Sequence, residues 1–323
     1  MAETFQALPH DTDINGDPRL TGVEIEFSGL DADRVAQIAT DALGGSAQQQ
    51  DDHAWRVSDS RIGKLDIYLD TALRHKDSSP IKRIGLDIGK EVIPVEIVTE
   101  PLDLDGLAAL DGLRDDLRQA GAEGTRAGLA YGFGVHLNPA IARRDAAGIT
   151  APLMAYALCE AWMREAHPID FSRRVLPFTD PYPTKLVSAL CEAGVVTPEA
   201  AMEIYLEHAP SRNYGLDMLP IFAWLDEDRV RDALGGGKAV SARPAFHFRL
   251  PDCRIDEADW TLRSEWTRWR LVEQVAADQG LLARLMREWD DMHGAITLRR
   301  TPWAERCGEI LADAGAISER TAA

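Results

Sequence analysis

Several short stretches of this sequence alternate apolar and polar residues, and this pattern limits the possible fold more than any other feature. In residues 21–27, apolar side chains alternate with Glu24 and Glu26. A period of two is typical of a β-strand that buries one of its faces. Strand-like segments also cover residues 55–57, 64–69, 92–98, 129–138 and 244–250. The chain is therefore expected to build a sheet with one apolar and one polar face.

Helical periodicity separates and follows these strands. Residues 31–43 and 104–120 carry apolar side chains every three or four positions, and a glycine follows each segment. The pattern is helical again over about 150–235 and over 258–316, whereas residues 75–82 read as a charged connection. Strands, one crossover helix, more strands and then helices indicate an α+β fold with a largely antiparallel sheet and a helical insertion.

The balance of charge excludes some classes of partner. The chain has 35 Lys and Arg against 53 Asp and Glu, which gives a net charge of -18. Such a surface repels nucleic-acid phosphates and anionic lipids, so we expect no nucleic-acid partner and no membrane partner. A solvated acidic surface is the simpler explanation of this charge, although a cationic amine substrate or metal-binding carboxylates would fit it as well.

Cysteine usage and the N-terminal residues predict the compartment. The four cysteines lie far apart, without the paired spacing of a zinc site or of a small disulfide framework. The first twenty residues lack the apolar stretch of a secretory signal, and no run approaches the ~18 apolar residues of a membrane span. These features predict a cytoplasmic protein with reduced thiols.

The polar residues of the strands come in pairs two positions apart, a spacing that directs both side chains to one face of a sheet. The pairs are Glu24 with Glu26, His136 with Asn138, and His247 with Arg249, and a further strand carries Glu96, with Glu100 four positions on. Each pair taken alone is typical of the solvated side of an antiparallel strand. If the strands share one sheet, however, the pairs gather carboxylates, imidazoles and a guanidinium on one surface.

A divalent cation is the natural partner of such a surface. Neighbouring carboxylates repel each other and raise each other's pKa, and a cation between them relieves this repulsion. Oxygen ligands with one imidazole suit Mg²⁺ or Mn²⁺ better than structural zinc. Arg212, in a short segment between helical stretches, could clamp a phosphate with two hydrogen bonds, although an arginine on such a loop is more often idle at the surface.

Five motifs, in this order, resemble those of the amidoligases, relatives of glutamine synthetase and glutamate–cysteine ligase among the carboxylate–amine ligases. They read TGVEIEF, PVEIVTEPL, YGFGVHLNP, SRNYGLDMLP and AFHFRLPD, within residues 19–252. The resemblance implies a glutamine-synthetase-like curved, mainly antiparallel sheet whose polar face binds ATP and Mg²⁺, with Mn²⁺ as the alternative ion. It also implies that an amine attacks an acyl phosphate to form an amide or isopeptide bond.

The resemblance implies roles for individual residues. Those matched to metal binding are Glu24, Glu26, Glu96, His136 and His247. Those matched to the nucleotide phosphates are His136, Asn138, Arg212 and Arg249, and the two arginines are also matched to the developing acyl phosphate. Glu100 is our candidate acceptor of the amine's proton, with Asp66 as a second candidate. One position departs from the family pattern, because His247 stands where relatives carry an acid, and this leaves that metal ligand open.

On this interpretation the chain divides into a flexible segment at 1–18, an amidoligase catalytic domain at 19–257 with its insertion at about 150–235, and a C-terminal helical extension at 258–323 packed on the catalytic domain. The expected substrates are a small-molecule or peptide carboxylate and an amine, and the oligomeric state is open. Two alternatives remain. One is a metal-dependent phosphohydrolase on the same acidic surface, and the other is a non-catalytic relative that binds nucleotide or peptide, which the histidine at 247 favours.

Overall fold

The computed structural model describes residues 4–69, 93–128, 131–175, 179–236, 240–293 and 301–318. Its strands and helices, in chain order, are β1 (Thr21–Phe27), α1 (Ala32–Leu43), β2 (Ser46–Asp51), β3 (Ala54–Ser60), β4 (Gly63–Leu69), β5 (Val95–Thr99), α3 (Leu104–Gln119), β6 (Val135–Pro139), α4 (Thr150–Ala166), α5 (Phe171–Val175), α6 (Thr184–Ala193), α7 (Pro198–His208), α8 (Leu219–Leu225), α9 (Glu227–Ala233), α10 (Leu262–Ala277), α11 (Gln279–Met292) and α12 (Thr301–Asp313). The charged connection expected at 75–82 lies outside the described residues.

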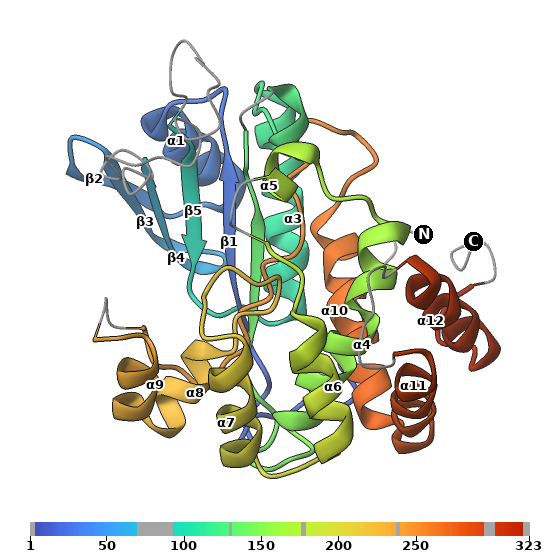
Figure 1. Cartoon of the computed structure of the whole chain (residues 1–323). Helices are drawn as coiled ribbons and strands as arrows, with labels where there is room; N and C mark the ends of the chain where they lie inside the picture. Colours follow the sequence, from blue (N-terminus) through green and yellow to red (C-terminus); the bar gives the residue numbers. More distant parts are fainter. Residues whose placement is uncertain are drawn as a thin grey trace.

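The six described strands form one antiparallel sheet in the order β2-β3-β4-β5-β1-β6. β1 therefore lies between β5 and β6, which carry two of the other predicted polar motifs. Figure 1 shows the sheet with most of the later helices gathered beside and below it. The predicted α+β class and the antiparallel sheet are confirmed.

One face of the sheet is apolar because alternate residues of its inner strands are apolar. Ile25 on β1, Ile97 on β5 and Ile67 on β4 are at most 1% exposed. Helix α1 contacts β2, β3 and β4 and packs on α3, and the apolar sides of both helices join the same hydrophobic core. This packing leaves the opposite face to the polar residues of the strands.

The helices after β6 pack mainly on one another. Helix α4 lies at their centre and contacts α6, α10, α11 and α12, so most of its side chains are buried. The contact with α12 includes a hydrogen bond of 2.8 Å from the indole N–H of Trp303 to the carbonyl oxygen of Leu158. The C-terminal helices therefore share a core with the residues of the predicted insertion.

The segment before β1, whose residues 1–18 we expect to be flexible, has defined contacts with α10 from Phe5 onward, and Arg19 just after it adds to them. Phe5 and Leu8 are buried, and the ring of Phe5 lies 6.4 Å from that of Trp266 on α10. Arg19 donates two hydrogen bonds, of 2.6 and 2.7 Å, to the carboxylate of Glu273 on the same helix. These contacts tie the start of the chain to α10.

The segment expected to form a last strand at residues 244–250 is extended but is not a regular strand. Phe248 exchanges two backbone hydrogen bonds of 2.9 Å with Leu137 on β6. The next residue, Arg249, instead donates its N–H to the carbonyl oxygen of Gly215 on the other side. Pro244 and Pro251 at the two ends have no N–H to donate, which interrupts the ladder.

Strands β6 and β2 also differ from expectation. β6 begins only at Val135, although we expect a strand from residue 129; residues 129–130 lie outside the described part of the chain. β2 is absent from our sequence prediction because its residues, SAQQQD, are all exposed and carry no alternation of apolar and polar side chains. It is an edge strand that pairs with β3. Both of its faces are exposed to solvent, so its residues need not alternate between apolar and polar.

Candidate active site on the polar face of the sheet

The polar face brings together the acidic and basic side chains of three neighbouring strands. Glu24 on β1 lies opposite His136 on β6, and Glu26 lies opposite Glu96 on β5. Because residues directly opposite in an antiparallel pair point to the same face, all four side chains share one side of the sheet. These four side chains therefore lie on one face of the sheet, as the alternation in the sequence predicts.

Glu24 makes several polar contacts on this face. Its Oε2 lies 2.7 Å from Nδ1 of His136, its Oε1 accepts a hydrogen bond of 3.0 Å from the amide of Asn138, and Arg243 lies 4.0 Å away. Burial alone would raise the pKa of Glu24. The hydrogen bond from His136 and the charges of His136, His247 and Arg243 outweigh burial and hold this pKa well below its usual value.

His247 approaches the same carboxylate from the extended segment beside β6. Its Nε2 lies 4.0 Å from Glu24 Oε2, and its Nδ1 lies 3.4 Å from Asp217 Oδ2. The ring is buried, and within the described part of the chain Nε2 has no hydrogen-bond partner. Burial first, and then the neighbouring charge of His136, lower the pKa of His247 to about 4, so its imidazole is neutral at pH 7.

Asp217 anchors this part of the site. It is fully buried and accepts hydrogen bonds from the backbone N–H of Leu219 at 3.0 Å and from Nε of Arg212 at 3.1 Å. Burial alone would raise the pKa of Asp217, but the bonds and charges of His247 and Arg212 lower it. An ionised carboxylate therefore sits behind His247, on the side away from Glu24.

Three of the five predicted metal ligands form one possible metal-binding cluster. One ligand atom each from Glu24, His136 and His247 lies within 4.8 Å of the other two. Glu26 and Glu96 are outside this cluster: Glu26 accepts a hydrogen bond of 2.8 Å from the N–H of Gly134, and Glu96 is buried opposite it. The face thus offers a centre with two nitrogens and one oxygen beside a separate pair of carboxylates.

The two predicted arginines lie together at the rim of this face. Arg249 Nη1 donates to the carbonyl oxygen of Arg212 at 2.6 Å, and its Nε is buried without a partner in the described structure. Burial lowers the pKa of Arg249, the charges of Arg173 and Arg212 lower it further, and the charges of Asp217 and Glu26 oppose these effects. Closely placed guanidiniums of this kind favour an anionic ligand.

Two arginines that sequence reasoning missed support the site. Arg173 on α5 is 1% exposed and donates to the carbonyl oxygens of Arg249 and Leu250, at 2.9 and 3.0 Å. A Cβ on Gly134 would lie 2.8 Å from Nη2 of Arg173, so this glycine makes room for the guanidinium. Arg243 donates to Oδ1 of Asn138 at 2.8 Å. Neither arginine has a signal in the sequence, because each acts through contacts between distant segments.

Glu100 and Asp66, the two candidate proton acceptors, lie apart from this cluster. Glu100 Oε2 accepts a hydrogen bond of 3.0 Å from the backbone N–H of Lys64, and the ammonium of Lys64 lies 3.8 Å from both carboxylates. Asp66 also accepts a bond of 2.6 Å from Arg56. These partners stand on β3 and β4, whereas β1 flanks the other side of β5.

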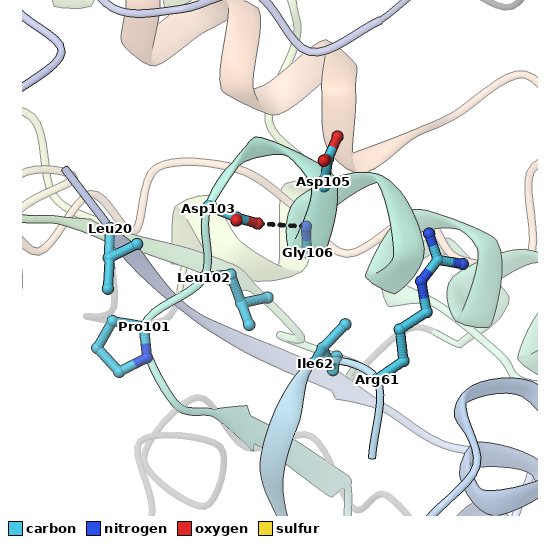
Figure 2. A pocket seen from close by; sticks show the side chains of 8 residues that line it. All are labelled: Leu20, Arg61, Ile62, Pro101, Leu102, Asp103, Asp105 and Gly106. Carbon is cyan, nitrogen blue, oxygen red and sulfur yellow. Dashed lines mark hydrogen bonds between the residues drawn. The ribbon is translucent and has the colours of Figure 1, made fainter. Parts of the chain in front are cut away.

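A cavity of about 300 Å³ lies elsewhere, between the β3–β4 turn and the start of α3. Figure 2 shows its lining residues: Leu20, Arg61, Ile62, Pro101, Leu102, Asp103, Asp105 and Gly106. The carboxylate of Asp103 accepts a hydrogen bond of 2.7 Å from the N–H of Gly106 and thereby caps the helix. None of the predicted site residues lines this cavity.

Comparison with known proteins identifies the family. A model of the family described as "Putative amidoligase enzyme" matches residues 17–271, which is most of the chain. The protein therefore belongs to the amidoligase enzyme family, which confirms the resemblance carried by the five motifs. No curated protein and no solved structure matches the chain. Among the described residues, every helix is too short or too polar to cross a membrane.

Proposed function

We propose that this protein is an ATP-dependent carboxylate–amine ligase that forms an amide or isopeptide bond on the polar face of its sheet. Membership of the amidoligase family supports amide-bond formation. The observation that carries the proposal is the gathering of Glu24, Glu26, Glu96 and His136 beside Arg249 on the polar face of the sheet. A glutamine-synthetase-like curvature of the sheet is part of the same proposal.

The Mg²⁺ that the family implies fits one part of this face. Glu26 and Glu96 lie directly opposite each other, and a divalent cation relieves the repulsion between neighbouring carboxylates. They offer the hard oxygen ligands that Mg²⁺ takes together with water and substrate phosphates. Bound there, Mg²⁺ would neutralise phosphate charge. The centre of Glu24, His136 and His247 has two nitrogen donors and does not fit Mg²⁺ in the same way.

In the proposed reaction an oxygen of the carboxylate substrate attacks the γ-phosphorus of ATP, the bond to the bridging oxygen breaks, and ADP leaves. The amine then attacks the acyl carbon, the bond from this carbon to the phosphate oxygen breaks, inorganic phosphate leaves, and the amine's proton passes to a carboxylate of the same face. Arg249 and Arg212 stabilise the anionic groups in both steps. We assign no role to Glu100, because its contacts are with Lys64 on β4.

ADP release tests this proposal. The purified protein is incubated with ATP, Mg²⁺, pooled carboxylates and pooled amines, and each component is omitted in turn. We expect ADP only when both pools are present. A double variant, Glu24→Gln with Glu26→Gln, is expected to release ADP at least a hundredfold more slowly. Glu309→Gln is the matched control, because its side chain is 63% exposed on α12.

The same assay separates the alternatives. ADP release that needs neither pool would indicate a phosphohydrolase, and ATP binding without ADP release over a broad panel of amines would indicate a binding protein. Unchanged turnover in the double variant would remove both glutamates from the proposal.

A further inference from the structure

The centre formed by Glu24, His136 and His247 has the donor atoms of a transition-metal site. The atoms that face one another are Oε2 of Glu24, Nδ1 of His136 at 2.7 Å and Nε2 of His247 at 4.0 Å from that oxygen. Metal–ligand distances are about 2.1 Å for nitrogen and oxygen, so two ligands of one ion lie at most about 4.2 Å apart. Both distances to the carboxylate oxygen are within this limit, and all three ligand atoms lie within 4.8 Å of one another.

Hydrogen bonds to neighbouring side chains orient these donor atoms toward one another. Asp217 forms a hydrogen bond with Nδ1 of His247, so the other ring nitrogen, Nε2, faces Glu24. Asn138 donates to Oε1 of Glu24 and leaves Oε2 for the two imidazoles. A carboxylate behind a metal-binding histidine fixes the ring and its tautomer, as Asp217 does here. The two rings meet edge to face with their centroids 5.2 Å apart.

A bound metal ion accounts for one feature of the cluster that its hydrogen bonds do not. Nε2 of His247 is buried and lacks a hydrogen-bond partner in the described structure, and an orphaned polar atom of this kind is costly. Glu24 and His136 satisfy each other by their hydrogen bond, so an ion pair accounts for those two residues but leaves His247 unexplained. A metal ion between the three residues satisfies all of them.

We propose that Glu24, His136 and His247 bind a first-row transition-metal ion such as Mn²⁺, Fe²⁺, Co²⁺ or Zn²⁺ in preference to Mg²⁺. Imidazole nitrogen favours these ions, and two histidines with one carboxylate are a recurring set of ligands for them, whereas Mg²⁺ prefers oxygen. The centre is distinct from the carboxylate pair of Glu26 and Glu96 assigned to Mg²⁺. Binding of the ion does not depend on the ligase reaction, so the test of this inference can fail while the proposed function holds, and the reverse.

Competition between metals tests the inference. The protein is stripped with a chelator, dialysed against micromolar Mn²⁺ or Zn²⁺ with a thousandfold excess of Mg²⁺, and analysed for metal content. We expect about one transition-metal ion per chain under both conditions. Co²⁺ should give visible absorption bands that report nitrogen ligands. A chain that holds no transition metal, or loses it to the Mg²⁺ excess, would overturn the inference.

Two variants of His247 locate the ion. His247→Gln is expected to weaken binding of Mn²⁺ at least tenfold, whereas His247→Glu, which replaces nitrogen by oxygen, should shift the preference toward Mg²⁺. His53→Gln is the matched control, because His53 is exposed in the β2–β3 turn. If His247→Gln does not fold, as judged by circular dichroism, Asp217→Asn takes its place and is expected to weaken binding 10- to 100-fold. Equal metal binding by the folded His247 variants and the control would also refute the site.

Discussion

The polar face of the sheet has two halves that resemble each other in sequence but not in structure. On β3 and β4, Arg56 and Asp66 form an ion pair of 2.6 Å whose side chains are 41% and 31% exposed. On β1 and β6, the pair of Glu24 and His136 is similarly short, but its side chains are only 21% and 7% exposed. In the second half, burial shifts the pKa values of ionisable side chains and leaves some polar atoms without a hydrogen-bond partner in the described structure. The comparison teaches that burial, and not alternation, distinguishes the two halves of this face.

The largest expected effect concerns Arg249, at the rim of the buried half. Arg249→Gln removes a guanidinium whose Nε has no partner in the described structure, so the stabilisation of phosphate charge is lost. We expect ADP release with pooled carboxylates and amines to fall about a hundredfold. Steady-state rates at saturating ATP measure this loss.

Arg143→Gln is the control for that variant, because Arg143 is 57% exposed and pairs with Asp145. Its rate is expected to stay within twofold of the unaltered protein. Equal rates for the two variants would show that Arg249 does not contact the reacting groups.

A smaller effect is expected in the pH dependence of stability without metal. His247 has a pKa of about 4 when folded against an ordinary 6.5, so between these values the unfolded chain binds the extra proton. Stability is therefore full above pH 6.5 and is lost as the pH falls toward 4. Between pH 7 and pH 5 this histidine is expected to cost about 2 kcal/mol of unfolding free energy.

Urea unfolding in the presence of a chelator measures this cost. The pKa of His167 is also lowered to about 4, chiefly by burial, so the comparison is made in a His167→Gln background. In that background, adding His247→Gln is expected to flatten the dependence between pH 7 and pH 5. An unchanged slope would contradict the neutral, buried state of His247.

The smallest effects are expected in the exposed half. Arg56→Gln removes one partner of an exposed ion pair, so the urea midpoint of unfolding should stay close to that of the unaltered protein. Glu100→Gln should leave ADP release within threefold, because this carboxylate is 51% exposed and bonded to Lys64. A hundredfold loss in Glu100→Gln would restore this residue as the acceptor of the amine's proton.

The sequence alone determined most of the strands and the shared face of the polar doublets on β1 and β6. The alternation in β1 requires Glu24 and Glu26 to share a face opposite Ile25, whatever the neighbouring strands are, because successive side chains of a strand point to opposite sides. The same rule placed His136 with Asn138 on β6. Helices α3 and α7 also follow from their periodicity and caps, since these signals are local.

The tertiary structure decided which polar residues meet. Strand order placed β1 between β5 and β6, and so joined Glu24 to His136 but left Glu100 with Lys64 on β4. The supporting residues Asp217 and Arg173 come from segments distant in sequence, and their roles depend on backbone hydrogen bonds that no periodicity encodes. Local pattern fixes the direction of a side chain, whereas its neighbours, its burial and hence its pKa depend on long-range packing.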